Sequence, residues 1–121
     1  DMSGVFDSCV SLTSIDVSNF DTSSIQIFTS LFKNCASLTY IDISKFNTEK
    51  ATSISSMFEG CSSLTSLNVS KFKTSNVESI DNLFKDCILL TSIDVSNFDT
   101  SKVTMANYLF YNCTSLKSIN L

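Results

Sequence analysis

The sequence has no histidine, arginine, tryptophan or proline, and it contains only two glycines among 121 residues. Without histidine the chain cannot form a Ser-His or Cys-His catalytic pair, because histidine is the usual general base of such sites. Two glycines are also too few for a glycine-rich phosphate-binding loop. We therefore expect a protein that is not an enzyme and that carries no cofactor.

The charged residues exclude further classes of partner. Twelve acidic side chains against eight lysines give a net charge of −4, whereas a nucleic-acid groove needs a basic stripe. No run approaches the ~18 apolar residues of a membrane span, and no secretory signal opens the chain. We expect no nucleic-acid partner and no direct membrane insertion of this segment.

A repeat of 26 residues runs through the whole chain without insertion or deletion. Numbered from residue 1, the copies cover 1–26, 27–52, 53–78, 79–104 and 105–121, which is about 4.65 repeats. Nine columns of this alignment hold 43 of the 52 hydrophobic residues. Each copy must therefore bury its apolar side against its neighbours, as the copies of a solenoid do. We expect residues 1–121 to form a single array, and we interpret them as an excerpt of a longer one because neither end carries a polar cap.

Two periodicities alternate within a copy. Ile15 and Val17 keep the two-residue step of a strand, whereas Ile25, Phe28 and Leu31 follow at three-residue steps, as on one stripe of a helix. A threonine column headed by Thr22 stands between them and is suited to cap the helix. The pattern predicts an α/β solenoid, with a parallel β-sheet on the concave face and short helices or helical turns on the convex face.

The rhythm of leucine, isoleucine and valine from Leu12 to Val17 resembles a leucine-rich repeat. More narrowly, residues 57–67 (MFEGCSSLTSL) and 96–101 (SNFDTS) resemble the BspA-like surface repeats of the DUF285 family. The chain departs from ordinary leucine-rich repeats after the strand, where it carries a phenylalanine in place of an asparagine or cysteine. We expect a stacked phenylalanine ladder to stabilise that bend; its members are Phe20, Phe46, Phe72 and Phe98.

The outward positions of the predicted strands form the candidate binding face. We predict that a ligand contacts Asp16, Tyr40, Asp42, Asn68 and Asp94, with Tyr40 as the only large aromatic side chain on this face. Two other interpretations stay open. The face could be a solvated surface that discourages aggregation, or Asp16 and Asp42 could share a calcium ion, although no closing loop supports such a site.

The cysteine column allows three interpretations. Buried free thiols, disulfides between copies and a metal site are all compatible with stacked cysteines; the column comprises Cys9, Cys35, Cys61, Cys87 and Cys113. No C-x-x-C spacing and no histidine support a metal, and an odd number cannot pair completely. We expect free thiols that pack as small hydrophobic groups, with no metal.

The resemblance implies a function that the residues alone do not. BspA-like proteins are secreted or attached to the cell surface and are associated with binding host matrix proteins and with co-aggregation. We therefore expect a non-enzymatic adhesion module that binds a protein or glycan ligand on its concave face. A host matrix protein is one such ligand. The alternative is a structural spacer, stalk or filament with end-to-end self-association, whose recognition lies elsewhere in a longer protein.

Overall fold

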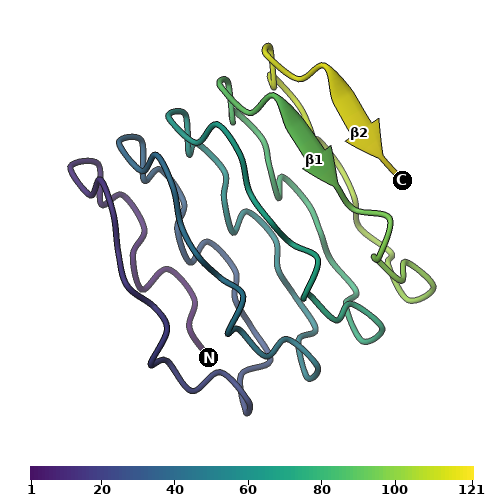
Figure 1. Cartoon of the computed structure of the whole chain (residues 1–121). Coiled ribbons are helices and arrows are strands. Elements are labelled where there is room, and N and C mark those ends of the chain that lie inside the picture. The colour runs from purple at the N-terminus through teal and green to yellow at the C-terminus, as the bar shows by residue number, and fades with distance from the viewer.

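The computed structural model describes residues 1–121 as a stack of coils, one for each copy of the repeat (Figure 1). Successive copies lie side by side in the order of the sequence. Two short strands are formed, β1 (Ser92–Asp94) and β2 (Ser118–Asn120), and they pair in parallel with Ser92 opposite Ser118. The chain has no helix, and hence none long and apolar enough to cross a membrane.

Consecutive tight turns replace the predicted helices. In copy 2 the Leu31 amide donates to the Phe28 carbonyl at 3.1 Å, and the Lys33 amide donates to the Ser30 carbonyl at 3.2 Å. Ser30 and Asn34 have φ values of 59° and 57°, and the fourth and eighth residues of the other copies are left-handed as well. A right-handed helix needs a negative φ at every residue. Of the two alternatives predicted for this stripe, short helices do not form and successive turns do, because a three-residue apolar spacing fits both.

These turns build the hydrogen-bonded face of the solenoid, which we call the turn face (residues 1–8, 27–34, 53–60, 79–86 and 105–112). The amides of the second, fourth, sixth and eighth residues of each copy donate to carbonyls of the next copy. For example, Phe32 donates to Met57 and Phe58 to Leu83, at 3.0 and 3.1 Å. All four junctions between copies carry these four bonds. The main ladder between copies therefore lies where helices had been expected.

The predicted sheet is formed only in part. We call residues 13–18, 39–44, 65–70, 91–96 and 117–121 the strand face, and only its last two segments contain β1 and β2. No backbone hydrogen bond joins 39–44 to 65–70. The concavity of this face stays a prediction.

The predicted core is confirmed. All 26 buried apolar side chains belong to the nine columns found in the sequence, and Phe32, Phe58 and Phe84 have no exposed surface. Their rings form a continuous stack from Phe6 to Phe110, with centroids 5.5 to 6.2 Å apart. The stacked ladder is thus not the predicted one. Phe20 and Phe46 instead pack against rings of this column, Phe20 at 6.0 Å from Phe6 and Phe46 at 6.4 Å from Phe32.

An asparagine does stabilise the bend after the strand, although the sequence analysis assigned this task to phenylalanine. The Asn97 amide nitrogen lies 3.2, 3.3 and 3.0 Å from the carbonyl oxygens of Val69, Ser70 and Phe72 in the preceding copy. Lys45 and Lys71 occupy the equivalent position in copies 2 and 3. Those two copies consequently lack these contacts.

The threonine column joins neighbouring copies and caps no helix. The Thr48 hydroxyl accepts a hydrogen bond from the Lys73 amide at 2.7 Å and donates to the Lys73 carbonyl at 3.1 Å. Thr22 and Thr74 make the same pair of bonds to Asn47 and Asp99. All three threonines are buried. Each hydroxyl therefore satisfies two backbone groups that would otherwise lack a partner.

We predict that Thr48→Val lowers the free energy of unfolding by about 3 kcal/mol, because it leaves the Lys73 amide and carbonyl unpaired near the core. Thr48→Ser keeps the hydroxyl and should cost only about 1 kcal/mol for the lost methyl group. Thr100→Val is the matched control, since Thr100 is exposed and its hydroxyl makes no hydrogen bond. Urea unfolding followed by circular dichroism measures all three, and equal losses for Val and Ser at position 48 would contradict this role.

An ion-pair ladder crosses the turn face. Lys33 and Lys85 place their ammonium groups 3.0 and 3.1 Å from the two carboxylate oxygens of Glu59. Glu59 is largely buried, and this burial raises its pKa. Hydrogen bonds from Ser56, Lys33 and Lys85 outweigh the burial, so that the pKa of Glu59 lies below its usual value. The carboxylate thus joins three copies in its charged form.

Because the folded-state pKa of Glu59 is lowered, its contribution to stability is present at neutral pH and is lost on acidification. We predict that the midpoint temperature of thermal unfolding decreases as the pH is lowered from about 5 to about 3. Glu59→Gln should unfold at a lower temperature at pH 7 and show a shallower fall with acid. The remaining fall comes from exposed aspartates whose pKa values are also lowered. Parallel pH curves for both proteins would contradict a role for Glu59.

Candidate functional site

The strand face displays the predicted site residues in one exposed row. Its inward neighbours, such as Ile41, Leu67 and Ile93, are buried in the core. This alternation follows from the two-residue period of extended chain. All the predicted ligand contacts point outward and are exposed, namely Asp16, Tyr40, Asp42, Asn68 and Asp94.

The acidic column has a structural task that the sequence analysis missed. Asp42 Oδ1 accepts a hydrogen bond from the Ser44 amide at 2.9 Å, and Asp16 and Asp94 accept equivalent bonds from Ser18 and Ser96. Asn68 does the same for Ser70 at 2.9 Å. These bonds define the turn at the end of each strand segment. The two-residue spacing between Asp or Asn and Ser was a signal for this turn.

These turns also explain the charge state of the column. Hydrogen bonds from the side chain and the backbone of Ser44 lower the pKa of Asp42. The neighbouring charge of Asp16 raises the pKa of Asp42, but more weakly than the hydrogen bonds lower it. Repulsion between the stacked carboxylates of Asp16 and Asp42 is therefore small beside the hydrogen bonds that Asp42 accepts.

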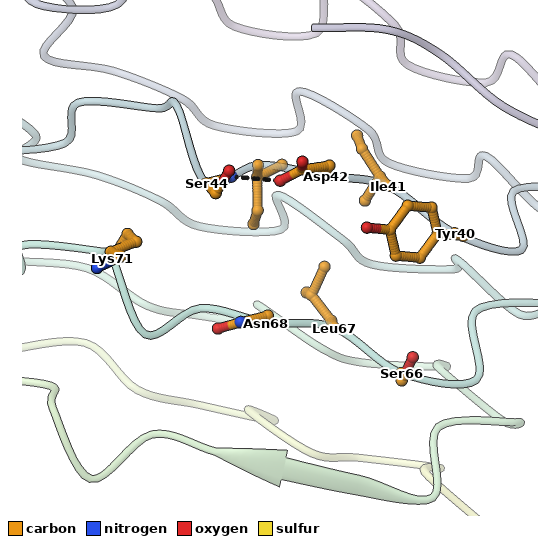
Figure 2. A pocket seen from close by; sticks show the side chains of 9 residues that line it. Tyr40, Ile41, Asp42, Ser44, Ser66, Leu67, Asn68 and Lys71 are labelled. Atoms are coloured by element: carbon orange, nitrogen blue, oxygen red, sulfur yellow. Dashed lines mark hydrogen bonds between the residues drawn. The ribbon is translucent and has the colours of Figure 1, made fainter. Parts of the chain in front are cut away.

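A depression about 220 Å³ in volume opens between copies 2 and 3, where the strand face lacks backbone hydrogen bonds. Figure 2 shows Tyr40, Ile41 and Leu67 toward one end, and Ser44 and Lys71 toward the other. Asp42 and Asn68 lie between these ends. The structure thus places three of the five predicted residues around one depression; Asp16 and Asp94 lie outside it.

A second depression, about 560 Å³ in volume, continues past the strand segments. It shares Ser44 and Lys71 with the first and adds Lys73 and Glu49. Lys71 and Lys73 were not among the predicted ligand contacts. The sequence does distinguish these positions, because copies 1 and 4 carry Asn and Asp there instead of lysine.

The cysteine column is confirmed as free thiols, and three of the five are buried. Burial raises the pKa of Cys35 to about 11 and that of Cys87 to about 12. The sulfur atoms are not merely apolar filling, since Cys61 Sγ donates to the Phe32 carbonyl at 3.2 Å. Cys35, Cys87 and Cys113 make equivalent bonds to the preceding copy. The chain shows no group of three or more Cys, Asp or Glu side chains that could hold a metal ion.

The register, the buried columns and the stack of coils define a repeat solenoid of the leucine-rich-repeat class. A family model described as "Mycoplasma protein of unknown function, DUF285" matches residues 1–120. The chain belongs to this family, and the resemblance to BspA-like leucine-rich repeats is confirmed.

One solved structure supports the same fold. The crystal structure of a T. pallidum leucine-rich repeat protein matches this chain with a TM-score of 0.66 and 23% sequence identity. The match covers 98% of this chain and 50% of that protein, so the chain spans half the length of this relative. No curated protein is significantly similar to the chain. A likeness at this identity establishes the fold alone.

We predict that Asp42→Ala lowers the unfolding temperature, because it removes the acceptor that holds the turn at Ser44. Asp42→Asn keeps an acceptor and should unfold close to the wild-type temperature, as the natural Asn68 makes the same bond. Thermal unfolding at neutral pH distinguishes the two variants. If Asn destabilises as much as Ala, then the charge and not the turn is what matters at this position.

Proposed function

We propose that this chain is a non-enzymatic interaction module, displayed at the cell surface or secreted, that binds a protein or glycan ligand on its strand face. The observation that carries the proposal is the depression between copies 2 and 3. There, an exposed aromatic side chain, a carboxylate, an amide and a lysine surround a gap between two extended segments. Solenoids commonly use such extended surfaces to bind partners.

The resemblance to BspA-like repeats supports display at the cell surface and binding of a protein, but it does not identify the ligand. BspA-like repeats are associated with surface display and with binding of host matrix proteins, and we extend both properties to this chain as part of the proposal. The absence of histidine and the raised thiol pKa values both favour binding over catalysis, since neither an imidazole base nor a reactive thiolate is available at neutral pH.

The test is a binding screen against immobilised matrix proteins and glycans with the wild type and one strand-face variant. Asp16→Asn, Tyr40→Ser and Asp42→Asn are combined, because these changes keep the turn acceptors and give Tyr40 the residue found in the other four copies. We predict at least tenfold weaker binding of any ligand that the wild type binds. Tyr108→Asn removes an equally exposed tyrosine, 63% in both cases, from the turn face and should bind normally. Unchanged binding by the triple variant would exclude the strand face.

A structural spacer, stalk or filament is the second candidate, and the turn face favours it. All four junctions between copies carry the same four backbone hydrogen bonds, and such uniform coupling along the array suits a stalk or filament. A molar mass that rises with concentration in light scattering would support this candidate, and a constant monomer mass would contradict it.

A further inference from the structure

Lysines gather directly after the strand face in copies 2 and 3. At the positions just after the strand segments, copies 1 and 4 carry Asn and Asp, whereas Lys45, Lys71 and Lys73 gather in the two copies between them. These are three of only eight lysines in an acidic chain. None of the three forms an ion pair, although Glu49 and Asp42 lie nearby as counter-charges. In the two depressions Lys71 and Lys73 match Asp42 and Glu49 in number, but both lysines are exposed and in no ion pair, so their ammonium groups are available to an acidic ligand.

Lys71 occupies its position at the expense of local stability. Asn97, its equivalent in copy 4, donates to three carbonyl groups of the preceding copy. Lys71 makes no hydrogen bond at all, nor does Lys45 through its side chain. An asparagine can make these contacts at this position, so the fold does not require Lys45 or Lys71 there, and both lysines are free to serve a ligand.

The same region combines several kinds of recognition group along one groove. The two depressions share Ser44 and Lys71, so that they form one path from Tyr40 to Lys73. The extended segment from Tyr40 to Ser44 alone spans about 13 Å, which suits an oligomeric ligand and not a single small molecule. We call this path the copy 2–3 groove.

We propose that the copy 2–3 groove binds an acidic oligosaccharide. The Tyr40 ring offers a flat face to the C–H side of a sugar ring, and Asp42 and Asn68 offer acceptors and donors to its hydroxyl groups. Lys71 and Lys73 pair with a carboxylate or sulfate group of the sugar. This assignment rests on the proposed function and narrows it to one part of the strand face and one class of ligand.

An acidic saccharide fits the groove better than an acidic peptide. The exposed side chains of the groove carry mostly hydroxyl, amide, carboxylate and ammonium groups, which match an acidic polyhydroxylated ligand. Of its apolar residues only Tyr40 is exposed, so the groove offers little apolar surface to the alternate residues of a peptide. Salt screens the attraction between exposed lysines and an acidic ligand, so binding should weaken as the salt concentration rises.

The experiment measures binding of three probes by isothermal titration calorimetry at low and high salt. The probes are a chondroitin sulfate hexasaccharide, the neutral chitohexaose and the acidic peptide hexaglutamate. We expect the sulfated hexasaccharide to bind at least about tenfold more tightly than either other probe, with an affinity that falls as salt is added. Equal binding of hexaglutamate would overturn the saccharide assignment, and so would an absence of binding by the sulfated probe.

A variant matched to the repeat tests the location. Lys71→Asn combined with Lys73→Asp gives copy 3 the residues of copy 4, and Asn at position 71 should preserve or increase the unfolding temperature. We expect this variant to bind the sulfated hexasaccharide at least about tenfold more weakly than wild type does. Lys117→Thr removes a lysine far from the groove, at a column that carries threonine in the other copies, and should bind like wild type.

The outcomes separate this inference from the proposed function. If the folded Lys71→Asn/Lys73→Asp variant binds the sulfated probe as well as wild type does, the copy 2–3 groove is excluded. If no acidic saccharide binds but a matrix protein binds and is lost in the strand-face variant, then the proposed function stands and this inference falls.

Discussion

The backbone hydrogen bonds between turn faces are the constraint on which the rest of the structure depends. Each copy offers amides at its second, fourth, sixth and eighth residues, and the next copy meets them with carbonyls. A single inserted residue would shift every donor away from its acceptor and every apolar column out of line. The strict period of 26 residues follows from this coupling, and the cysteine thiols, buried threonines and phenylalanine stack add bonds and contacts at the same spacing.

The strand face is less tightly held, and this makes it available for binding. Its segments pair as strands only in β1 and β2, and one backbone hydrogen bond each joins 13–18 to 39–44 and 65–70 to 91–96. Between copies 2 and 3 the extended backbones lie without mutual hydrogen bonds. Polar groups of main chain and side chain there can serve a ligand. The solenoid therefore divides its tasks. The turn face fixes the register between copies, whereas the strand face and the bend that follows it tolerate changes such as Tyr40, Lys71 and Lys73.

The sequence predicted the repeat, the core and the orientation of the outward row because all three depend only on periodicity. It could not distinguish a helix from successive turns, since Phe28, Leu31 and Phe32 face the core in either case. The left-handed residues were hidden, because Ser30 and Asn34 take up a conformation more typical of glycine. The hydroxyl of Thr48 and the amide of Asn97 bond to neighbouring copies, and such contacts depend on the distance between coils, which the sequence does not give.

Hydrogen exchange of individual amides, measured by NMR, shows whether the turn face holds the copies together. Phe58 and Leu67 belong to the same copy and both side chains are buried, but only the Phe58 amide is bonded to the next copy. The account predicts slow exchange for Phe58 and its equivalents Phe32 and Phe84, and much faster exchange for Leu67 and Ile41. Equal or stronger protection of Leu67 and Ile41 would show that the strand face holds the copies together, and would contradict the account.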